Sequence, residues 1–566
     1  MLARRAADTV KAPLARAEVP PLADIGERYR WTREQLFGSG AITLGELLGR
    51  VPGVTDFASG WIATPHTNAY LGDFRRIRLF YDGVELDPLD VRIGPMHDFA
   101  SIPMWTLEEL VVERAAEELR VYMRSWRVNK TTPNTRVDVS TGDLSTNSYR
   151  GYFGRRFANS GALQLGAQQY STEDLRSGGD GDMLSIFGRL GWAKKQWSGD
   201  AVLLRTRRNR TEQVRDVETL AKLPPLDATR TDAYARMGYG DPEGARWLQI
   251  IVSTSRFAES NTKTATTTPA TPDAPFVGDT VDTTASRAQY VVTGGVKLLG
   301  ATLSAAGRYR TFNRRWYLTP SARLGYDRGM LSLTAYAEED AVDSTLRGDA
   351  SVRLAPLPYL AVAGSLGRTS GFQKADRPTS LTYRGEVGLR LGRLWATGGI
   401  MSIDTTVVPA PRAYDTLYAD VALGAHRGTF VTLRGPFWKA VGLNIVATKW
   451  DSVAYLPKYQ VRSELYASTS WLSRFPQGNF HVLASVAHEY RTQVAFPVVQ
   501  GDTTQSSPAQ QSTQYRVIST LFELRLYDAV LSWQYRNVIG EIYSVVPGFA
   551  APRAINYYGV RWDFFN

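Results

Sequence analysis

Arginines at alternating positions are the clearest candidates for chemistry in this sequence. Alternate residues of a β-strand point to one face, so these arginines share a face that is in contact with water. On one interpretation their charge, with the net charge of +11, creates a positive potential that concentrates anions. On the other, which we favour, they pair with carboxylates across neighbouring strands and with the N-terminal domain, and so stabilise the fold. The arginines are Arg353, Arg384, Arg390, Arg525 and Arg561, and the carboxylates are Glu386, Glu464, Glu523 and Asp563.

Other residue types argue against catalysis. The chain has no cysteine, which excludes disulfides, thiolate metal sites, iron–sulfur clusters and cysteine nucleophiles. No serine occupies a nucleophile elbow, and no glycine-rich phosphate loop follows a strand. The sequence therefore predicts neither an enzyme nor a bound cofactor. It also predicts no metal centre, because its histidines are too dispersed. These are His66, His97, His426, His481 and His488.

One acidic segment, Glu338-Glu339-Asp340 with Asp343 nearby, has the oxygen ligands that Ca²⁺ prefers. A solvated acidic rim is the interpretation that we favour for it.

Composition favours an all-β chain. Of the 566 residues, 11% are aromatic, and these gather in short alternating segments. No apolar run approaches the roughly 18 to 20 residues of a membrane-spanning helix. If the chain enters a membrane, it must do so as a closed barrel, which satisfies every backbone polar group. Nucleic-acid binding is disfavoured because the arginines are scattered rather than clustered.

The chain divides into three parts. Residues 1–37 have no regular period and predict a flexible leader, with no apolar core of an export signal. Residues 38–130 predict a small α+β domain, with a helix at Leu44–Leu48 capped by Thr43 and a hairpin that turns at Asp82-Gly83. Residues 131–566 predict one β-barrel of about 22 antiparallel strands.

The connections within the third part alternate between short turns and longer polar loops. A membrane barrel with tight turns at one rim and long loops at the other has this alternation. The strand count is least certain over residues 417–436, which form one bent strand or two. The last strand closes the barrel against a first strand at residues 136–142, and its lipid-facing residues are Tyr558, Val560, Trp562 and Phe564.

Three segments resemble the TonB-dependent outer-membrane receptors, whose N-terminal plug fills a 22-stranded barrel. The first ends in the plug-like pattern Leu47-Leu48, then Val51-Pro52-Gly53-Val54. The second is the Asp82-Gly83 hairpin, and the third is the run from Ser101 to Arg114. The glycine-rich stretch that follows in the family is replaced here by residues 114–123, so the plug sequence differs from the family at this point. Whether an energy-coupling partner can remodel this plug is therefore left open by the sequence.

The resemblance implies an outer-membrane transporter that takes up a small ligand, such as a metal chelate or another anionic solute. Its implied partners are outer-membrane lipid, the barrel-assembly machinery and a TonB-type energy-coupling protein. Asp8-Thr9-Val10 is the candidate contact for that protein, by addition of a strand to its sheet. The alternative is a barrel of the same origin that is a non-coupled channel, a surface-binding protein or a scaffold.

Overall fold

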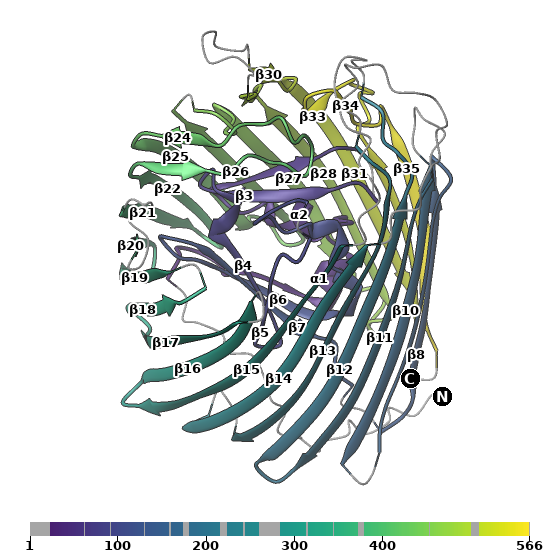
Figure 1. The fold of residues 1–566 in the computed structure, drawn as a ribbon. Helices are drawn as coiled ribbons and strands as arrows, with labels where there is room; N and C mark the ends of the chain where they lie inside the picture. The colour runs from purple at the N-terminus through teal and green to yellow at the C-terminus, as the bar shows by residue number, and fades with distance from the viewer. Residues whose placement is uncertain are drawn as a thin grey trace.

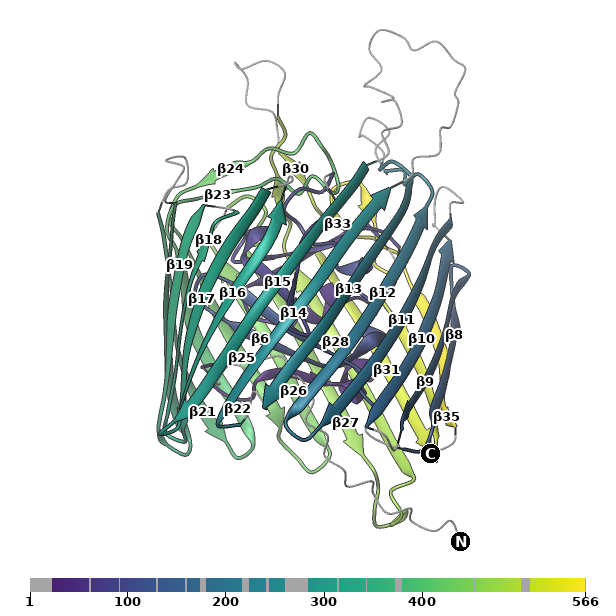
Figure 2. The same cartoon turned by 60° about the horizontal axis from the view of Figure 1, so that its bottom comes forward.

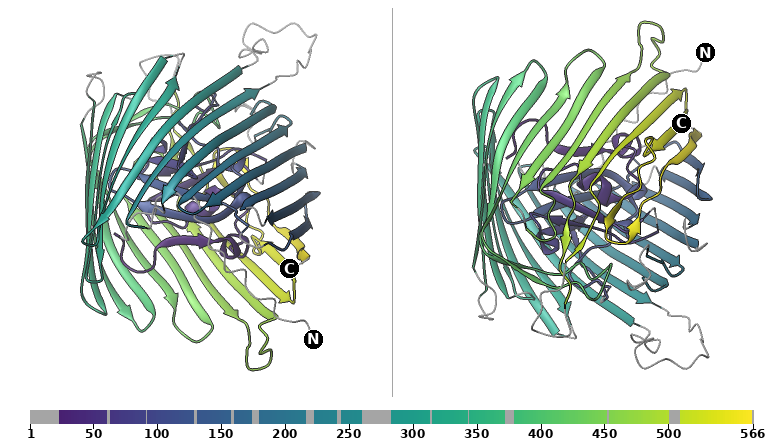
Figure 3. Two further views of the ribbon diagram at one scale, coloured as in Figure 1. Left: turned by 90° about the horizontal axis from the view of Figure 1, so that it is seen from below. Right: turned by 90° about the horizontal axis from the view of Figure 1, so that it is seen from above.

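The computed structural model contains a closed antiparallel barrel of 22 strands, with the described residues between 23 and 128 inside its lumen (Figures 1 and 3). The fold class expected from the sequence is therefore confirmed. The structure describes residues 23–60, 63–90, 92–128, 131–157, 160–173, 180–215, 223–240, 244–259, 283–312, 315–342, 344–371, 379–451, 453–499 and 509–564.

The barrel strands follow one another around the wall, and the last pairs with the first. They are β8 (Asn134–Gly142), β9 (Thr146–Arg156), β10 (Gly161–Glu173), β11 (Asp180–Lys194), β12 (Trp197–Arg210), β13 (Leu226–Gly240), β14 (Arg246–Glu259), β15 (Thr283–Leu298), β16 (Ala301–Phe312), β17 (Arg315–Arg328), β18 (Leu331–Asp340), β19 (Thr345–Leu357), β20 (Leu360–Gly371), β21 (Ser380–Leu391), β22 (Leu394–Ile403), β25 (His426–Pro436), β26 (Val441–Trp450), β27 (Tyr459–Thr469), β28 (Phe480–Arg491), β31 (Tyr515–Leu526), β32 (Ala529–Arg536) and β35 (Ile555–Phe564).

Short turns lie at one rim of the barrel and longer connections at the other (Figure 2). The predicted turns at Leu299-Gly300, Gly392-Arg393 and Tyr527-Asp528 each join two consecutive strands. The uncertain region at residues 417–436 proves to be two elements. β24 (Val421–Leu423) pairs with β23 (Thr406–Val408) in a loop hairpin, and β25 alone belongs to the wall.

The plug is built on a five-stranded sheet of order β1-β6-β7-β4-β5. Its strands are β1 (Tyr29–Thr32), β6 (Leu107–Arg114), β7 (Leu119–Ser125), β4 (Ile77–Tyr81) and β5 (Val84–Leu86). The prediction of a flexible leader to residue 37 is wrong for its last part, because β1 pairs with β6 and helix α1 (Arg33–Phe37) follows it. The rest of that leader, residues 1–22, lies outside the described residues.

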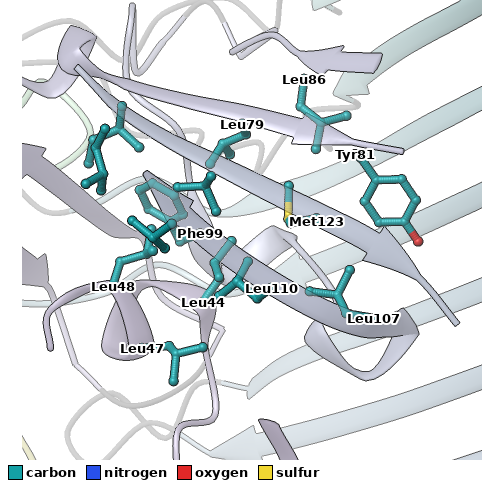
Figure 4. Packing of buried hydrophobic residues seen from close by; sticks show 14 of the residues in the cluster. Leu44, Leu47, Leu48, Leu79, Tyr81, Leu86, Phe99, Leu107, Leu110 and Met123 are labelled. Atoms are coloured by element: carbon teal, nitrogen blue, oxygen red, sulfur yellow. The ribbon is translucent and has the colours of Figure 1, made fainter. Parts of the chain in front are cut away.

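Local signals account for the other plug elements. Helix α2 (Leu44–Leu48) begins where the Thr43 hydroxyl accepts a hydrogen bond from the Glu46 N–H, as predicted. The Asp82-Gly83 turn has φ values of 50° and 90°, the left-handed conformation of a tight hairpin. Leucines of α2 pack against the sheet in an apolar core (Figure 4), which continues into wall residues such as Phe187 and Ile251. The remaining elements are β2 (Val54–Ala58), β3 (His66–Tyr70) and the 3₁₀ turns η1 (Phe74–Arg76), η2 (Phe99–Ser101) and η3 (Met104–Thr106).

A second apolar core covers the plug at the long-loop rim. Phe57 and Phe74 of the plug pack with Tyr414, Tyr418 and Phe496 from the loops between wall strands. These loops also carry the hairpins β29–β30 (Ala495–Phe496, Gln510–Gln511) and β33–β34 (Ser544–Val546, Phe549–Ala550). We call this group of loops the cap. Among the described residues, no helix is long and apolar enough to cross a membrane.

Candidate functional site

The plug is fixed to one side of the barrel by buried ion pairs, and Arg78 of β4 is at their centre. Its guanidinium contacts Glu85 at 2.7 Å, Glu118 at 3.2 Å and Glu338 of β18 at 2.8 Å. The Arg78 side chain is 5% exposed and that of Glu338 is fully buried. Buried charges are tolerated only when they are paired in this way.

This network continues along β15 to β19, where plug and wall alternate in charge. Desolvation by burial would raise the pKa of Glu118, but the nearby arginines outweigh it and lower the pKa to about 2. The network contains Arg78, Arg120, Arg287, Arg308, Arg310, Arg323 and Arg347, with Glu85, Asp87, Glu113, Glu118, Glu338, Asp340 and Asp349.

The acidic segment of β18 belongs to this network. Glu338 and Asp340 are buried and paired with arginines, so both sequence interpretations, a calcium site and a solvated rim, are wrong for them. Asp343 lies outside the described residues.

We expect Arg78→Met to destabilise the docked plug by about 3–5 kcal/mol, because it leaves three buried carboxylates without their shared cation. Urea unfolding measures the loss of stability, and single-channel conductance in planar bilayers measures the displacement of the plug. Arg207→Met is the control. Its ion pair with Asp227 has 54% and 31% of the two side chains exposed, so we expect no measurable loss of stability. Equal effects would contradict the central role of Arg78.

Two further ion pairs join the N-terminal residues to the wall at β21, and a close approach joins them at β20. Arg384 binds Asp24 at 2.8 Å, and Arg114 lies 3.5 Å from Glu386. The sequence between β6 and β7 lacks the glycine-rich stretch found in the TonB-dependent receptors. The small residue that allows plug and wall to approach closely is instead a glycine of the wall. A Cβ on Gly367 of β20 would lie 3.1 Å from that of Ala116, so glycine permits this close approach.

On the opposite side, a cavity of about 190 Å³ separates the plug from β27, β28, β31 and β32. Its lining is polar and mixed in charge. From the plug come Thr43, Glu46, Arg50, Asp56 and His66, and from the wall come Gln460, Arg462, Glu464, Glu489, Gln534 and Arg536. The cavity extends upward to Tyr543 in the cap.

The link between α1 and α2, residues 38–42, closes the cavity toward the short-turn rim. We call it the floor segment. Arg536 and Gln534 donate to the carbonyl of Gly40 at 2.6 and 2.8 Å, and Arg50 donates to that of Ser39 at 2.7 Å. Below the cavity, Gly38 lies against Leu483 and Glu523 of the wall. The floor segment is thus held mainly by hydrogen bonds to its carbonyl oxygens.

Glu46 connects the floor segment to the wall. Its carboxylate contacts Arg536 at 2.8 and 2.9 Å and accepts from the Ile42 N–H at 3.1 Å. Burial alone would raise the pKa of Glu46, but the charge and hydrogen bonds of Arg536 outweigh it and lower the pKa to about 2.

Acid is therefore expected to loosen the floor segment. A carboxylate whose pKa falls on folding stabilises fully above its ordinary pKa of 4.5 and loses this contribution as the pH falls toward 2. The protection factors for hydrogen exchange of residues 38–42, which are corrected for the intrinsic pH dependence of exchange, should fall as the pH drops between these values. In Glu46→Gln the exchange should already be fast at neutral pH, with a smaller dependence on pH in that window. An unchanged pH dependence in this variant would contradict the assignment.

The predicted arginines all lie on strands whose alternation puts them on the inner face. Arg384 is buried and bound to Asp24, and Arg561 binds Glu523 at 2.7 and 2.8 Å. Arg525 lies 3.4 Å from Glu34 of α1, while Arg353 is half-buried and Arg390 is exposed near the short-turn rim. This placement favours the interpretation in which the arginines pair with carboxylates over the one in which they create a positive potential inside the barrel.

The histidines form no cluster, and within the described ranges no group of acidic or histidine residues could hold a metal ion. His66 hydrogen-bonds Thr43 at 2.8 Å beside the cavity. The predicted partner contact at Asp8-Thr9-Val10 lies outside the described residues. Tyr558, Val560 and Trp562 point outward from β35, which pairs with β8.

Comparison with solved structures shows a shared fold. A variant of the ferric enterobactin receptor from Pseudomonas aeruginosa aligns with a TM-score of 0.70 at 13% identity, over 94% of this chain and 98% of the receptor. The siderophore receptor PirA from Acinetobacter baumannii aligns at 0.69 and 10%, over 94% and 98%. The FrpB iron transporter from Neisseria meningitidis aligns at 0.66 and 10%, also over 94% and 98%. No protein-family model and no curated protein sequence matches the chain.

Proposed function

We propose that this protein is an outer-membrane transporter of the TonB-dependent receptor type that takes up a small polar solute through its plugged barrel. The observation that carries this proposal is the polar cavity beside the plug, closed at one end by the floor segment. The plug sheet is held by buried ion pairs along β12 to β21, whereas the opposite side is hollow.

The solute would enter past the cap, occupy the cavity and leave after the floor segment moves. A metal chelate or another anionic solute is the ligand class that the resemblance suggests, and the names of the similar structures agree with it. The mixed charge of the cavity lining suits a solute that carries both donors and anionic groups. We propose residues 131–566 as the barrel, and we extend the plug, predicted at 38–130, to include β1 and α1 from Tyr29 onward.

The test begins with mass spectrometry of small molecules that co-purify with the protein. Uptake of the identified solute into cells is then measured with the proton gradient intact and collapsed. We expect uptake to fall to background without the gradient, and also in cells that lack the TonB-type partner. Uptake that persists in both conditions would contradict energy coupling.

A second candidate is a barrel of the same fold that does not transport by energy coupling. The cap favours this candidate. The Tyr414 hydroxyl accepts a hydrogen bond from the Thr67 N–H at 3.2 Å, and the cap loops bury Phe57 and Phe74 of the plug. A surface-binding or scaffold protein would keep this cap closed. Gradient-independent uptake supports a passive channel, and no uptake at all supports a scaffold.

A further inference from the structure

The outward face of the barrel carries a basic patch at the long-loop ends of β12 and β14. Along these strands exposed and buried residues alternate, and the exposed ones are mostly apolar. Leu203 and Val252 have 47% and 45% of their surface exposed. Arg205, Arg207 and Arg256 continue the same exposed face beyond them.

Strand register places two of these arginines on either side of one threonine. Arg205 of β12 lies opposite Thr231 of β13, and Thr231 lies opposite Arg256 of β14. Directly opposite residues of antiparallel strands point to the same face, and neighbouring strands are about 4.8 Å apart. The two arginine backbones are therefore about 9.6 Å apart. Both long side chains can reach one oxyanion above the Thr231 hydroxyl.

The charges around this position leave two cations unbalanced. Arg207 is paired with Asp227 at 3.3 Å, and Asp182 of β11 also acts on Arg207. For Arg205 and Arg256, the described part of the chain provides no ion pair. An arginine on a lipid-facing surface is costly unless its head lies at the polar interface, where an anion can pair with it.

The outward face of the wall below Thr231 is apolar. Along β13 the outward residues after Thr231 are Ala233 and Ala235. The larger Leu203 and Val252 each flank one of these alanines on one side only. Together these residues form an apolar outward surface against which an acyl chain can pack.

Aromatic residues place the arginines at the edge of the apolar band. Trp197 packs on Tyr239 at the short-turn end, with ring centroids 5.0 Å apart. Eight residues separate Trp197 from Arg205, or about 26 Å along the strand, and a tilt of about 40° reduces this to about 20 Å across an apolar band of about 25 Å, a difference that the long arginine side chain spans. On the long-loop side, Tyr309 stacks on Trp316 at 4.6 Å, as aromatic girdles do at interfaces.

We propose that Arg205, Thr231 and Arg256 bind the phosphate of a lipid headgroup in the leaflet on the long-loop side, with an acyl chain along Ala233 and Ala235. This inference rests on the proposed function in one respect, namely that the barrel spans a membrane. Charge complementarity identifies the phosphate, and the apolar outward surface below it favours a lipid over a free ion.

The test uses the full chain in bilayer discs of phosphatidylcholine that contain either bis-phosphorylated lipid A or its dephosphorylated form. Native mass spectrometry counts the lipid that stays bound. Wild type should retain the phosphorylated lipid selectively. In Arg205→Gln/Arg256→Gln, retention should fall by about tenfold, because two charge-assisted contacts to one phosphate are lost.

Arg246→Gln/Arg328→Gln is the matched control, since both arginines are exposed at the short-turn ends of β14 and β17. It removes the same charge and should leave retention unchanged. Equal loss in both variants, or no loss in either, overturns the proposal. Inorganic phosphate that binds as tightly as the lipid, and depends on the same arginines, shows a free-anion site and overturns the lipid assignment. Failure of the wild type to enter the discs contradicts the membrane setting instead.

Discussion

Deletion of Trp562 to Asn566 is expected to abolish insertion into the outer membrane. In β35, Trp562 lies opposite Val137 of β8 and opposite Ala529 of β32, so the deletion opens the wall between its first and last strands. Unpaired backbone groups in hydrocarbon cost several kcal/mol each, and an open barrel edge is not viable there. Membrane fractionation and the heat-dependent shift in gel mobility measure the outcome.

A deletion of the same length in a turn is the control. Residues 473–477 lie between β27 and β28 at the short-turn rim, outside every ladder, and their removal should leave the barrel assembled. A fully assembled, heat-modifiable barrel after the C-terminal deletion would show that β35 is not required for closure. Deletion of residues 1–36 should also leave insertion intact. Since it removes β1 and most of α1, it should loosen the plug as well as remove any coupling contact.

Patterns with a short period predicted most of this fold. The lipid face and the lumen face of each wall strand differ in polarity, so strand after strand alternates with a period of two residues. The helix cap at Thr43 and the Asp82-Gly83 turn are equally local. By contrast, β1 has four residues and pairs with β6 about 80 positions later, and no local pattern specifies such a pairing.

The site was harder to predict because its partners are distant in sequence. Glu338 forms an ion pair with Arg78, which is 260 residues away in the sequence. Without knowledge of that partner, an acidic segment is interpreted as solvent-exposed or as a cation site. The alternation of β18 does indicate on which face Glu338 lies, since Glu338 shares its buried face with Thr334 and Tyr336. The cavity has no sequence signal, because it is a gap left when the plug docks on one side of the wall.

A disulfide between Gly38→Cys and Leu483→Cys is expected to stop uptake until it is reduced. A Cβ on Gly38 would lie 3.1 Å from the Cδ2 atom of Leu483, so the two positions are direct neighbours across the interface between plug and wall. The chain has no other cysteine, so these would be the only thiols. If the floor segment must move for the solute to pass, uptake should fall to background in the oxidised protein and recover with a reductant.

Ala116→Cys with Gly367→Cys is the matched control. It ties the turn between β6 and β7 to β20, where the two Cβ positions are 3.1 Å apart, and the side chain and backbone nitrogen of Glu117 have to shift slightly to admit it. This disulfide fixes the sheet and leaves the floor segment free, so uptake should stay near the wild-type rate. A block by both disulfides would show that the whole plug moves. Normal uptake with both would show that the solute does not cross the floor segment.

The relative strength of the contacts decides which of these outcomes we expect. Displacing the sheet separates buried ion pairs such as Arg78–Glu338 and Arg114–Glu386, at about 3–5 kcal/mol for each uncompensated charge. Displacing the floor segment breaks hydrogen bonds from Arg536, Gln534 and Arg50 to carbonyl groups, each about 0.5–3 kcal/mol. Water in the cavity can replace those bonds, but it cannot replace the arginines inside the network. The floor segment is therefore the part of the plug that we expect to move first.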